Sequence, residues 1–211
     1  MAYDLEEQEK LDALRAWWER YGTLCAVVVF VVVAGIVGWR GWQWYEGHKA
    51  GQAMGYFEAL ESAAAQQGDD AVARIKAAST TLRSDFSGSG YTSRGVLVAA
   101  QALQERNDLD GAREQLEWLI KNSTDIALVS LARLRLAGVL LDQKQYEPAL
   151  AQLTDAPAAF EGLYADRRGD ILLAQGKQAE AKAAWEGALK ELGSDPVAQI
   201  VRLKIDALGG A

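Results

Sequence analysis

Side chains able to carry out catalytic chemistry are scarce in this sequence. Its 211 residues include one histidine, His48, and one cysteine, Cys25. A single cysteine excludes an internal disulfide and a cysteine-rich zinc site, and a single histidine excludes zinc sites built on several histidines. His48 alone could serve as the base of a Ser-His-Asp or Cys-His arrangement. It stands among Glu46, Gly47 and Lys49, next to an aromatic cluster, which favours a polar residue at an interface over a catalytic base.

Known catalytic and cofactor-binding motifs are also missing. The sequence has no H-E-x-x-H, G-x-S-x-G, phosphate-loop or dinucleotide-binding pattern, and no pair of carboxylates stands out as acid and base. The 22 Lys and Arg against 29 Asp and Glu give a formal charge of −7. This charge argues against nucleic acid, which is bound through a basic patch. We therefore predict a protein that is not an enzyme, with no cofactor, no metal site and no nucleic-acid partner.

Residues 21–39 form a block of 19 residues without a charge, closed by Arg20 and Arg40. As a helix the block spans roughly 28 Å, close to the bilayer hydrocarbon core of about 30 Å. Aromatic residues flank it on both sides, as is typical of the two membrane–water interfaces. They are Trp17, Trp18 and Tyr21 before the centre of the block and Trp39, Trp42, Trp44 and Tyr45 after it. A buried strand rarely runs so long, and a cleaved signal peptide has a shorter apolar region. We predict an uncleaved transmembrane anchor surrounded by membrane lipid.

The basic residues around this anchor predict its orientation. Three Lys or Arg lie in the first 20 residues and two in residues 40–59. Because Lys and Arg favour the cytoplasmic side, we expect a cytoplasmic N-terminus and the long C-terminal part across the membrane. The short tail has apolar residues at helical spacing, which predicts a helix that runs into the anchor.

The apolar spacing after the anchor is helical almost throughout, which predicts an all-α domain. Near the C-terminus, small and aromatic residues reproduce the spacing of a tetratricopeptide repeat. This pattern consists of Gly169, Leu172, Gly176, Ala181, Trp185 and Ala188. The small residues allow two helices to cross closely, and Trp185 is expected to fill the gap to the next repeat.

Degenerate copies of the pattern lie upstream, the first of them faint. The alanines at the equivalent position are Ala73, Ala112, Ala149 and Ala181, at spacings of 39, 37 and 32 residues. A regular tetratricopeptide array has a period of about 34 residues. Asn107 is expected in a left-handed turn, which asparagine tolerates. A plain helical bundle is the alternative, but the small-residue positions stay in phase over three copies and favour repeats.

Helical repeats of this kind present an extended concave surface for binding. The repeat phase predicts which side chains line it in this chain. They are Arg94, Leu97, Gln101, Leu134, Gly138, Asp166 and Asp170. A mixed lining of this kind suggests weak, permissive binding of extended or helical segments.

The whole chain resembles the YfgM-type ancillary subunits of the bacterial Sec translocon, which are membrane-anchored tetratricopeptide-like proteins. The resemblance covers nearly the full chain and is most specific at the end of the anchor and in the last repeat. The residues that carry it are Trp17-Trp18, Gly38-Trp39-Arg40, Asp166-Arg167-Arg168-Gly169-Asp170, Gly176 and Ala184-Trp185-Glu186.

This resemblance implies a bacterial inner-membrane protein that crosses the membrane once. Residues 1–20 would form a cytoplasmic helical tail, 21–39 the transmembrane anchor and 40–211 a periplasmic tetratricopeptide-like domain. The resemblance also implies association with the SecYEG translocon and with periplasmic chaperones, including a membrane-anchored prolyl isomerase-like protein. A cytoplasmic stress-response regulator is implied as a partner of the tail, where no sequence motif supports it.

These expectations together indicate a non-enzymatic adaptor at the Sec translocon. It would link exported proteins that emerge from the channel to periplasmic chaperones through the helical-repeat surface. The anchor would raise the local concentration of the domain for such clients. The alternative is a membrane-anchored scaffold that organises cell-envelope or division machinery, and the identity of the partners distinguishes the two.

Overall fold

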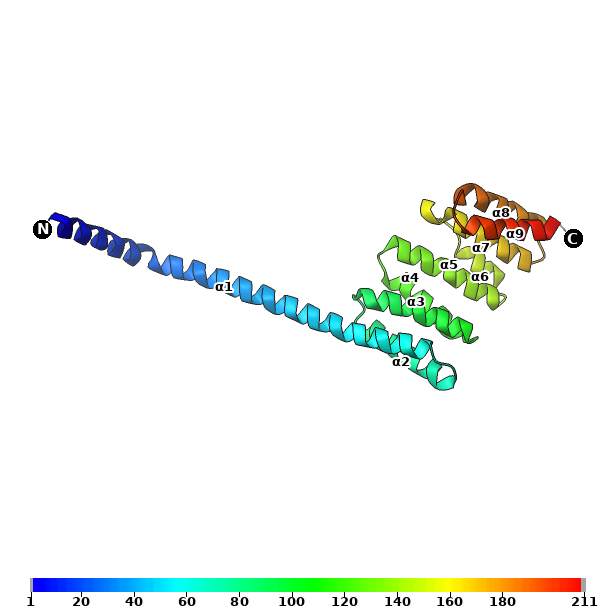
Figure 1. Ribbon diagram of the computed structural model, residues 1–211, viewed down its shortest axis with the longest axis horizontal. Helices are drawn as coiled ribbons and strands as arrows, with labels where there is room; N and C mark the ends of the chain where they lie inside the picture. The colour runs from blue at the N-terminus through cyan, green and yellow to red at the C-terminus, as the bar shows by residue number, and fades with distance from the viewer. Residues whose placement is uncertain (1, 210–211) are drawn as a thin grey trace. The chain divides into compact units, whose positions relative to one another are not determined.

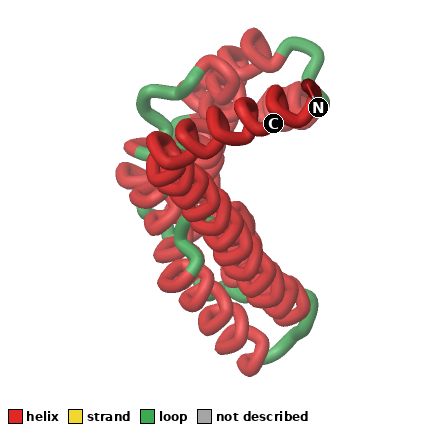
Figure 2. The backbone as a smooth tube through the Cα atoms, turned by 90° about the vertical axis from the view of Figure 1, so that its left-hand side faces the viewer, coloured by secondary structure: helices red, strands yellow, loops and turns green. Residues whose placement is uncertain are grey.

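The computed structural model describes the backbone of residues 2–209 and the side chains from residue 9 onward (Figure 1). The predicted tail 1–20 and domain 40–211 therefore extend beyond the described residues at their outer ends. The described chain is helical and contains no strand, which confirms the predicted all-α class (Figure 2). Its elements are α1 (Ala2–Ala64), α2 (Asp69–Asp85), α3 (Gly90–Glu105), α4 (Leu109–Asn122), α5 (Ile126–Asp142), α6 (Tyr146–Ala151), the 3-10 helix η1 (Ala158–Phe160), α7 (Glu161–Ala174), α8 (Gln178–Leu192) and α9 (Val197–Gly209).

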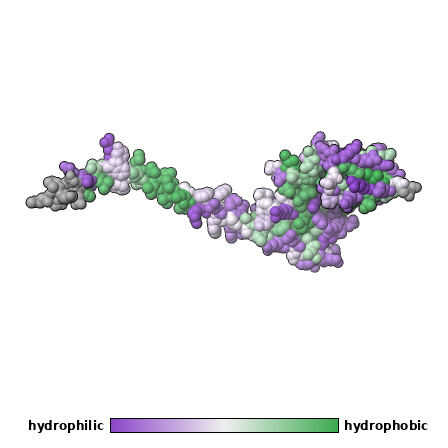
Figure 3. Space-filling model, turned by 45° about the horizontal axis from the view of Figure 1, so that its top comes forward, coloured by the Kyte–Doolittle hydropathy of each residue, from purple (hydrophilic) through white to green (hydrophobic). Residues whose placement is uncertain are grey.

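The chain divides into two compact units, one ending at Gly51 and the other beginning at Gln52. The first unit is the greater part of α1 and contains the uncharged block. Its apolar side chains are exposed, as at Phe30 with 73% and Val37 with 65% of the residue accessible. Figure 3 shows this block as a continuous hydrophobic section of the long helix. This section is long and apolar enough to cross a membrane, as predicted. The predicted domain boundary after residue 39 stays a prediction.

The second unit is built from antiparallel helix pairs. The last part of α1 precedes α2, α3 precedes α4, α5 precedes α6, and α7 precedes α8, with α9 packed against α8. In the first pair Leu60 is fully buried, and the Phe57 ring lies 5.8 Å from that of Tyr91 on α3. Buried side chains form one core from Ala53 to Ile171, and Trp185 with its neighbours forms a second cluster.

The same turn joins the helices of the last three pairs. Asn107, Lys144 and Gly176 have left-handed φ values of 61°, 59° and 79°. In each case the next residue donates its main-chain N–H to the carbonyl five residues earlier, at 2.9, 2.8 and 2.9 Å. This is the Schellman arrangement that closes a helix end. The recurrence of one turn at intervals of 37 and 32 residues confirms the predicted repeat and the left-handed Asn107.

The turn of the first pair is different, and the sequence prediction of its buried alanine is wrong. Gly68 is itself the residue that precedes α2, with φ 99°, whereas the other turns insert one residue between the left-handed position and the helix. The register of α2 is therefore displaced from that of α4 and α8. Ala73 is exposed as a result, and Ala71 and Ile75 are buried instead.

The large aromatic residue of the last pair packs on its own pair. Trp185 is 1% exposed, and its Nε1–H donates to the main-chain oxygen of Asp166 at 3.1 Å. Gly169 lies so close that a Cβ atom there would stand 2.3 Å from the indole nitrogen. The other side of the Trp185 cluster includes Val201 of α9. The small residue and the tryptophan are thus matched, with the ring shared between its own pair and the last helix.

Candidate partner-binding surface

The residues predicted to line the concave surface occupy equivalent positions in three first helices. One set stands ten residues and the other six residues before the left-handed residue of its own turn. The first set is Leu97, Leu134 and Asp166, and the second is Gln101, Gly138 and Asp170. Arg94 stands a further turn before Leu97 on α3. The structure thus gives the predicted residues a common register in α3, α5 and α7.

The predicted leucines on α3 and α5 are half-buried, and a hydrogen bond connects the two helices. Leu97 and Leu134 are both partly buried and pack against the main core. Arg135 donates its Nη1–H to the main-chain oxygen of Leu97 at 3.3 Å. Arg94 and Gln101 are exposed, and Gln101 donates to Glu105 on the same helix. The partly buried leucines and the exposed polar side chains together form a mixed set of apolar and polar groups.

Gly138 is covered by a side chain of the next helix pair and leaves no gap in the predicted surface. It is buried, and a Cβ atom built on it would lie 3.7 Å from the guanidinium carbon of Arg167. Arg167 stands on α7 and makes an ion pair of 3.6 Å with Asp170. The arginine of one helix therefore covers the glycine of the preceding first helix.

Asp166 and Asp170 are already occupied by the chain's own last helix. Lys204 of α9 places its Nζ 2.7 Å from Oδ1 of each carboxylate and 5.7 Å from the centre of the Trp185 ring. Burial raises the pKa of Asp166 above its ordinary 3.8, the Lys204 hydrogen bond lowers it in part, and the Asp170 charge raises it further. The acidic end of the predicted surface is thus neutralised from within.

Three kinds of residue beside the predicted surface were not predicted from the sequence. Leu131 and Leu163 occupy the position of Arg94 in α5 and α7, and both are partly buried. The intervals of 37 and 32 residues already contained this signal. Arg135 and Arg167 are likewise equivalent to each other. Lys204 had no local signal, because its partners lie 38 and 34 residues away.

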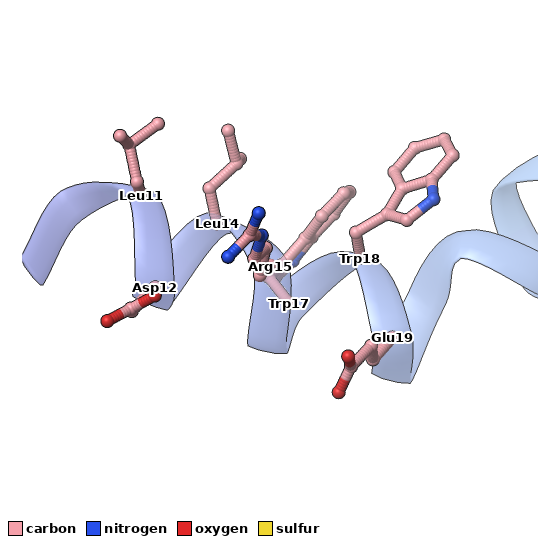
Figure 4. Close-up of a pocket in the computed structure, with 7 residues that line it drawn as sticks. All are labelled: Leu11, Asp12, Leu14, Arg15, Trp17, Trp18 and Glu19. Atoms are coloured by element: carbon pink, nitrogen blue, oxygen red, sulfur yellow. The ribbon is translucent and has the colours of Figure 1, made fainter. Parts of the chain in front are cut away.

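The segment before the uncharged block is amphipathic. Leu11, Leu14 and Trp18 project from one side of α1, and Asp12 and Glu19 project from the other (Figure 4). The Trp17 ring lies 5.7 Å from that of Tyr21, at the start of the block. Aromatic and apolar residues at this position suit the headgroup region of a bilayer. Among the residues searched in the described chain, no three His, Cys, Asp or Glu side chains gather as a metal site.

A protein of paired helices with this repeated turn is a tetratricopeptide-type repeat protein, and the comparison with known families agrees. The chain belongs to the tetratricopeptide repeat-like domain family, which matches residues 15–210.

Known relatives extend over almost the whole chain. A Haemophilus influenzae protein is 28% identical over 99% of this chain and 100% of its own length. A Neisseria gonorrhoeae protein is 29% identical over the same shares, and an Escherichia coli protein is 28% identical over 96% of each chain. All three are named "Ancillary SecYEG translocon subunit". The resemblance stated from the sequence is thereby confirmed.

Proposed function

We propose that this protein is a non-enzymatic, membrane-anchored adaptor that works at the SecYEG translocon. The observation that carries the proposal is the full-length similarity to three proteins named as ancillary subunits of that translocon. The organisation of this chain, in which an apolar helix is followed by helical repeats, also supports the proposal. Helical repeats of this kind present extended concave surfaces for binding.

The anchor would hold the protein in the bacterial inner membrane with a single pass. Residues 1–20 would lie in the cytoplasm, 21–39 in the bilayer and 40–211 in the periplasm. Tethering confines the domain near the channel and replaces a search through the periplasm by a high effective concentration. Weak contacts with each emerging chain are then sufficient for capture.

The concave surface would bind clients and chaperones, among them a membrane-anchored prolyl isomerase-like protein. Leu97 and Leu134 would supply apolar contact, and the exposed Arg94 and Gln101 would supply adaptable polar contact. The tail would contact a cytoplasmic stress-response regulator. Because Lys204 neutralises the acidic end, binding would be centred on α3 and α5.

Photo-crosslinking in living cells tests this function. Benzoylphenylalanine in place of Arg94 on α3 is expected to capture channel subunits, periplasmic chaperones or exported chains. The matched control replaces Lys182, which is exposed on α8, the second helix of its pair. Capture of wall-synthesis or division proteins from Arg94 contradicts the adaptor and favours an envelope scaffold. Equal capture from both positions contradicts the concave surface as the binding site.

A further inference from the structure

The third helix pair contains a pocket because its second helix is short. Helix α6 has 6 residues, whereas α4 has 14 and α8 has 15. After α6 the chain passes through Asp155, whose φ is 52°, and Pro157 to η1. The start of α5 therefore faces a loop where the other pairs have a helix. Between this loop, the end of α4, the start of α5 and α7 lies a cavity of about 350 Å³.

Arg133 of α5 lines this cavity and is half-buried without a partner. Its Nε is one of four buried arginine Nε atoms in the described chain that have no hydrogen-bond partner. The other three belong to Arg83, Arg106 and Arg167. In these residues the terminal nitrogens bind carboxylates or main-chain carbonyls. For Arg133 no hydrogen bond or ion pair is found within the described residues.

The neighbours of Arg133 do not neutralise it. The Tyr164 hydroxyl donates to the main-chain oxygen of Ser130 at 2.9 Å. Burial raises the pKa of Tyr164, and that hydrogen bond and the Arg133 charge offset the rise only in part, so the phenol stays neutral at physiological pH. Asp155 lines the cavity but makes no ion pair with Arg133. A partly desolvated guanidinium without a counter-charge is costly, and a ligand that supplies one relieves that cost.

The rest of the lining indicates what the ligand carries beside its charge. A carboxylate accepts two parallel hydrogen bonds from a guanidinium, which is the strongest pairing available to Arg133. The lining combines apolar and polar residues. Its apolar residues are Ile120, Ile126, Val129 and Pro157, and the polar ones beside Arg133 are Ser123, Thr124, Ser130 and Asp155. The volume suits a small group, at the lower end of the range for ligand pockets.

We propose that this pocket binds a carboxylate carried on an apolar residue, as found at the C-terminal end of a polypeptide. The pocket lies on the face of α5 that bears Ile126, Val129 and Arg133. Leu134 and Gly138 of the concave surface lie on a different face of the same helix, because one residue turns a helix by about 100°. The site goes beyond the proposed adaptor function and does not depend on it.

Titration of the full-length protein in detergent micelles tests this site. The probe is acetyl-Ala-Ala-Leu with a free carboxylate, followed by calorimetry and by the NMR signal of the Arg133 side chain. Its C-terminal amide is the neutral control. We expect the free acid to shift that signal and the amide to bind at least about tenfold more weakly, since hydrogen bonds between charged groups are strong. Arg133→Gln should weaken binding of the acid to the same extent.

Two further variants keep the test decisive. Lys121→Gln removes the same charge from an exposed position beside the pocket and should leave binding unchanged. Asp155→Asn removes a negative charge from the rim and should tighten binding several-fold, while asparagine tolerates the left-handed backbone. Equal loss in Lys121→Gln, undiminished binding in Arg133→Gln or no binding at millimolar probe overturns the proposal. Equal binding of acetyl-Ala-Leu-Glu amide overturns the assignment to chain ends.

Discussion

At the scale of single residues, the fit between Gly169 and Trp185 decides how closely α7 and α8 approach. The ring fills the space that a side chain on residue 169 would need, and it donates a hydrogen bond to the main chain of Asp166. A tryptophan in a core is satisfied only when its N–H has a partner. The glycine therefore admits both the packing and the hydrogen bond.

Gly169→Ala is predicted to destabilise the protein by about 1–3 kcal/mol, because overpacking displaces the buried ring. Gly187→Ala is the matched control, since a Cβ atom there would meet nothing within 4 Å. Alanine at that helical position should stabilise by about 0.5–1 kcal/mol. The free energy of unfolding of the full chain in micelles, measured by circular dichroism in denaturant, checks both. Equal effects of the two changes on the free energy of unfolding would show that the close contact at Gly169 does not affect stability.

The Lys204 contact makes a prediction with a defined pH dependence. The pKa of Asp166 is raised in the folded state, so its proton binds more tightly there than in the unfolded chain. Asp166 thus favours folding most below pH 3.8, and this contribution is lost as the pH rises through the raised pKa. Without Lys204 the pKa rises further. Lys204→Met should therefore cost about 1–3 kcal/mol at pH 7 and much less at pH 4.

Denaturant unfolding of the full chain at pH 7 and pH 4 measures this difference. Lys190→Met, at an exposed position in the last turn of α8, is the control and should be nearly neutral at both pH values. A Lys204→Met effect that is the same at pH 7 and pH 4 would show that the protonation of Asp166 does not depend on the lysine.

At the scale of the elements, the repeated turn explains why three helix pairs were predictable and the first was not. Glycine and asparagine are the residue types that most often adopt the left-handed conformation. Gly176 and Asn107 both do so, and each is followed five residues later by a buried alanine. In the first pair the left-handed glycine directly precedes the helix, one position nearer to it than in the other turns. Counting five residues from this glycine therefore leads to Ala73, which is exposed. The short α6 was not predicted either. Its end depends on the loop that follows, which local apolar spacing does not describe.

Lys144 stands at the one non-glycine, non-asparagine position among these three equivalent turns. A side chain in the left-handed region costs roughly 1–2 kcal/mol, and glycine is free of most of that cost. Lys144→Gly is predicted to stabilise the protein by about 1 kcal/mol, and Gly176→Ala to destabilise it by a similar amount. Thermal unfolding of the two variants provides the measurement. Opposite signs are required, and two changes of the same sign would contradict a shared turn geometry.

At the scale of the whole molecule, the sequence predicted the two-part organisation because each part has its own sequence pattern. The uncharged block is recognised by its length and its flanking aromatic residues, and the repeats are recognised by small residues at regular intervals. The side-chain contacts around the predicted concave surface could not be predicted. Its register follows from the repeats, but Arg167 over Gly138 and Lys204 on Asp166 are long-range contacts between side chains. Such contacts depend on how successive pairs stack, which no local pattern specifies.

The predicted orientation of the anchor rests on one extra basic residue on the N-terminal side. Starting from Cys25→Ser, which removes the single native thiol, a cysteine is placed either at Glu9 or at Ala183. A membrane-impermeant maleimide added to intact spheroplasts should label Ala183→Cys and leave Glu9→Cys unlabelled until the cells are lysed. The opposite labelling would place the repeat domain in the cytoplasm. Because a bias of one residue is small, Arg15→Ala and Arg20→Ala together should produce a mixture of both orientations. The control change Glu19→Ala should leave the orientation unchanged, since acidic residues contribute little to topology.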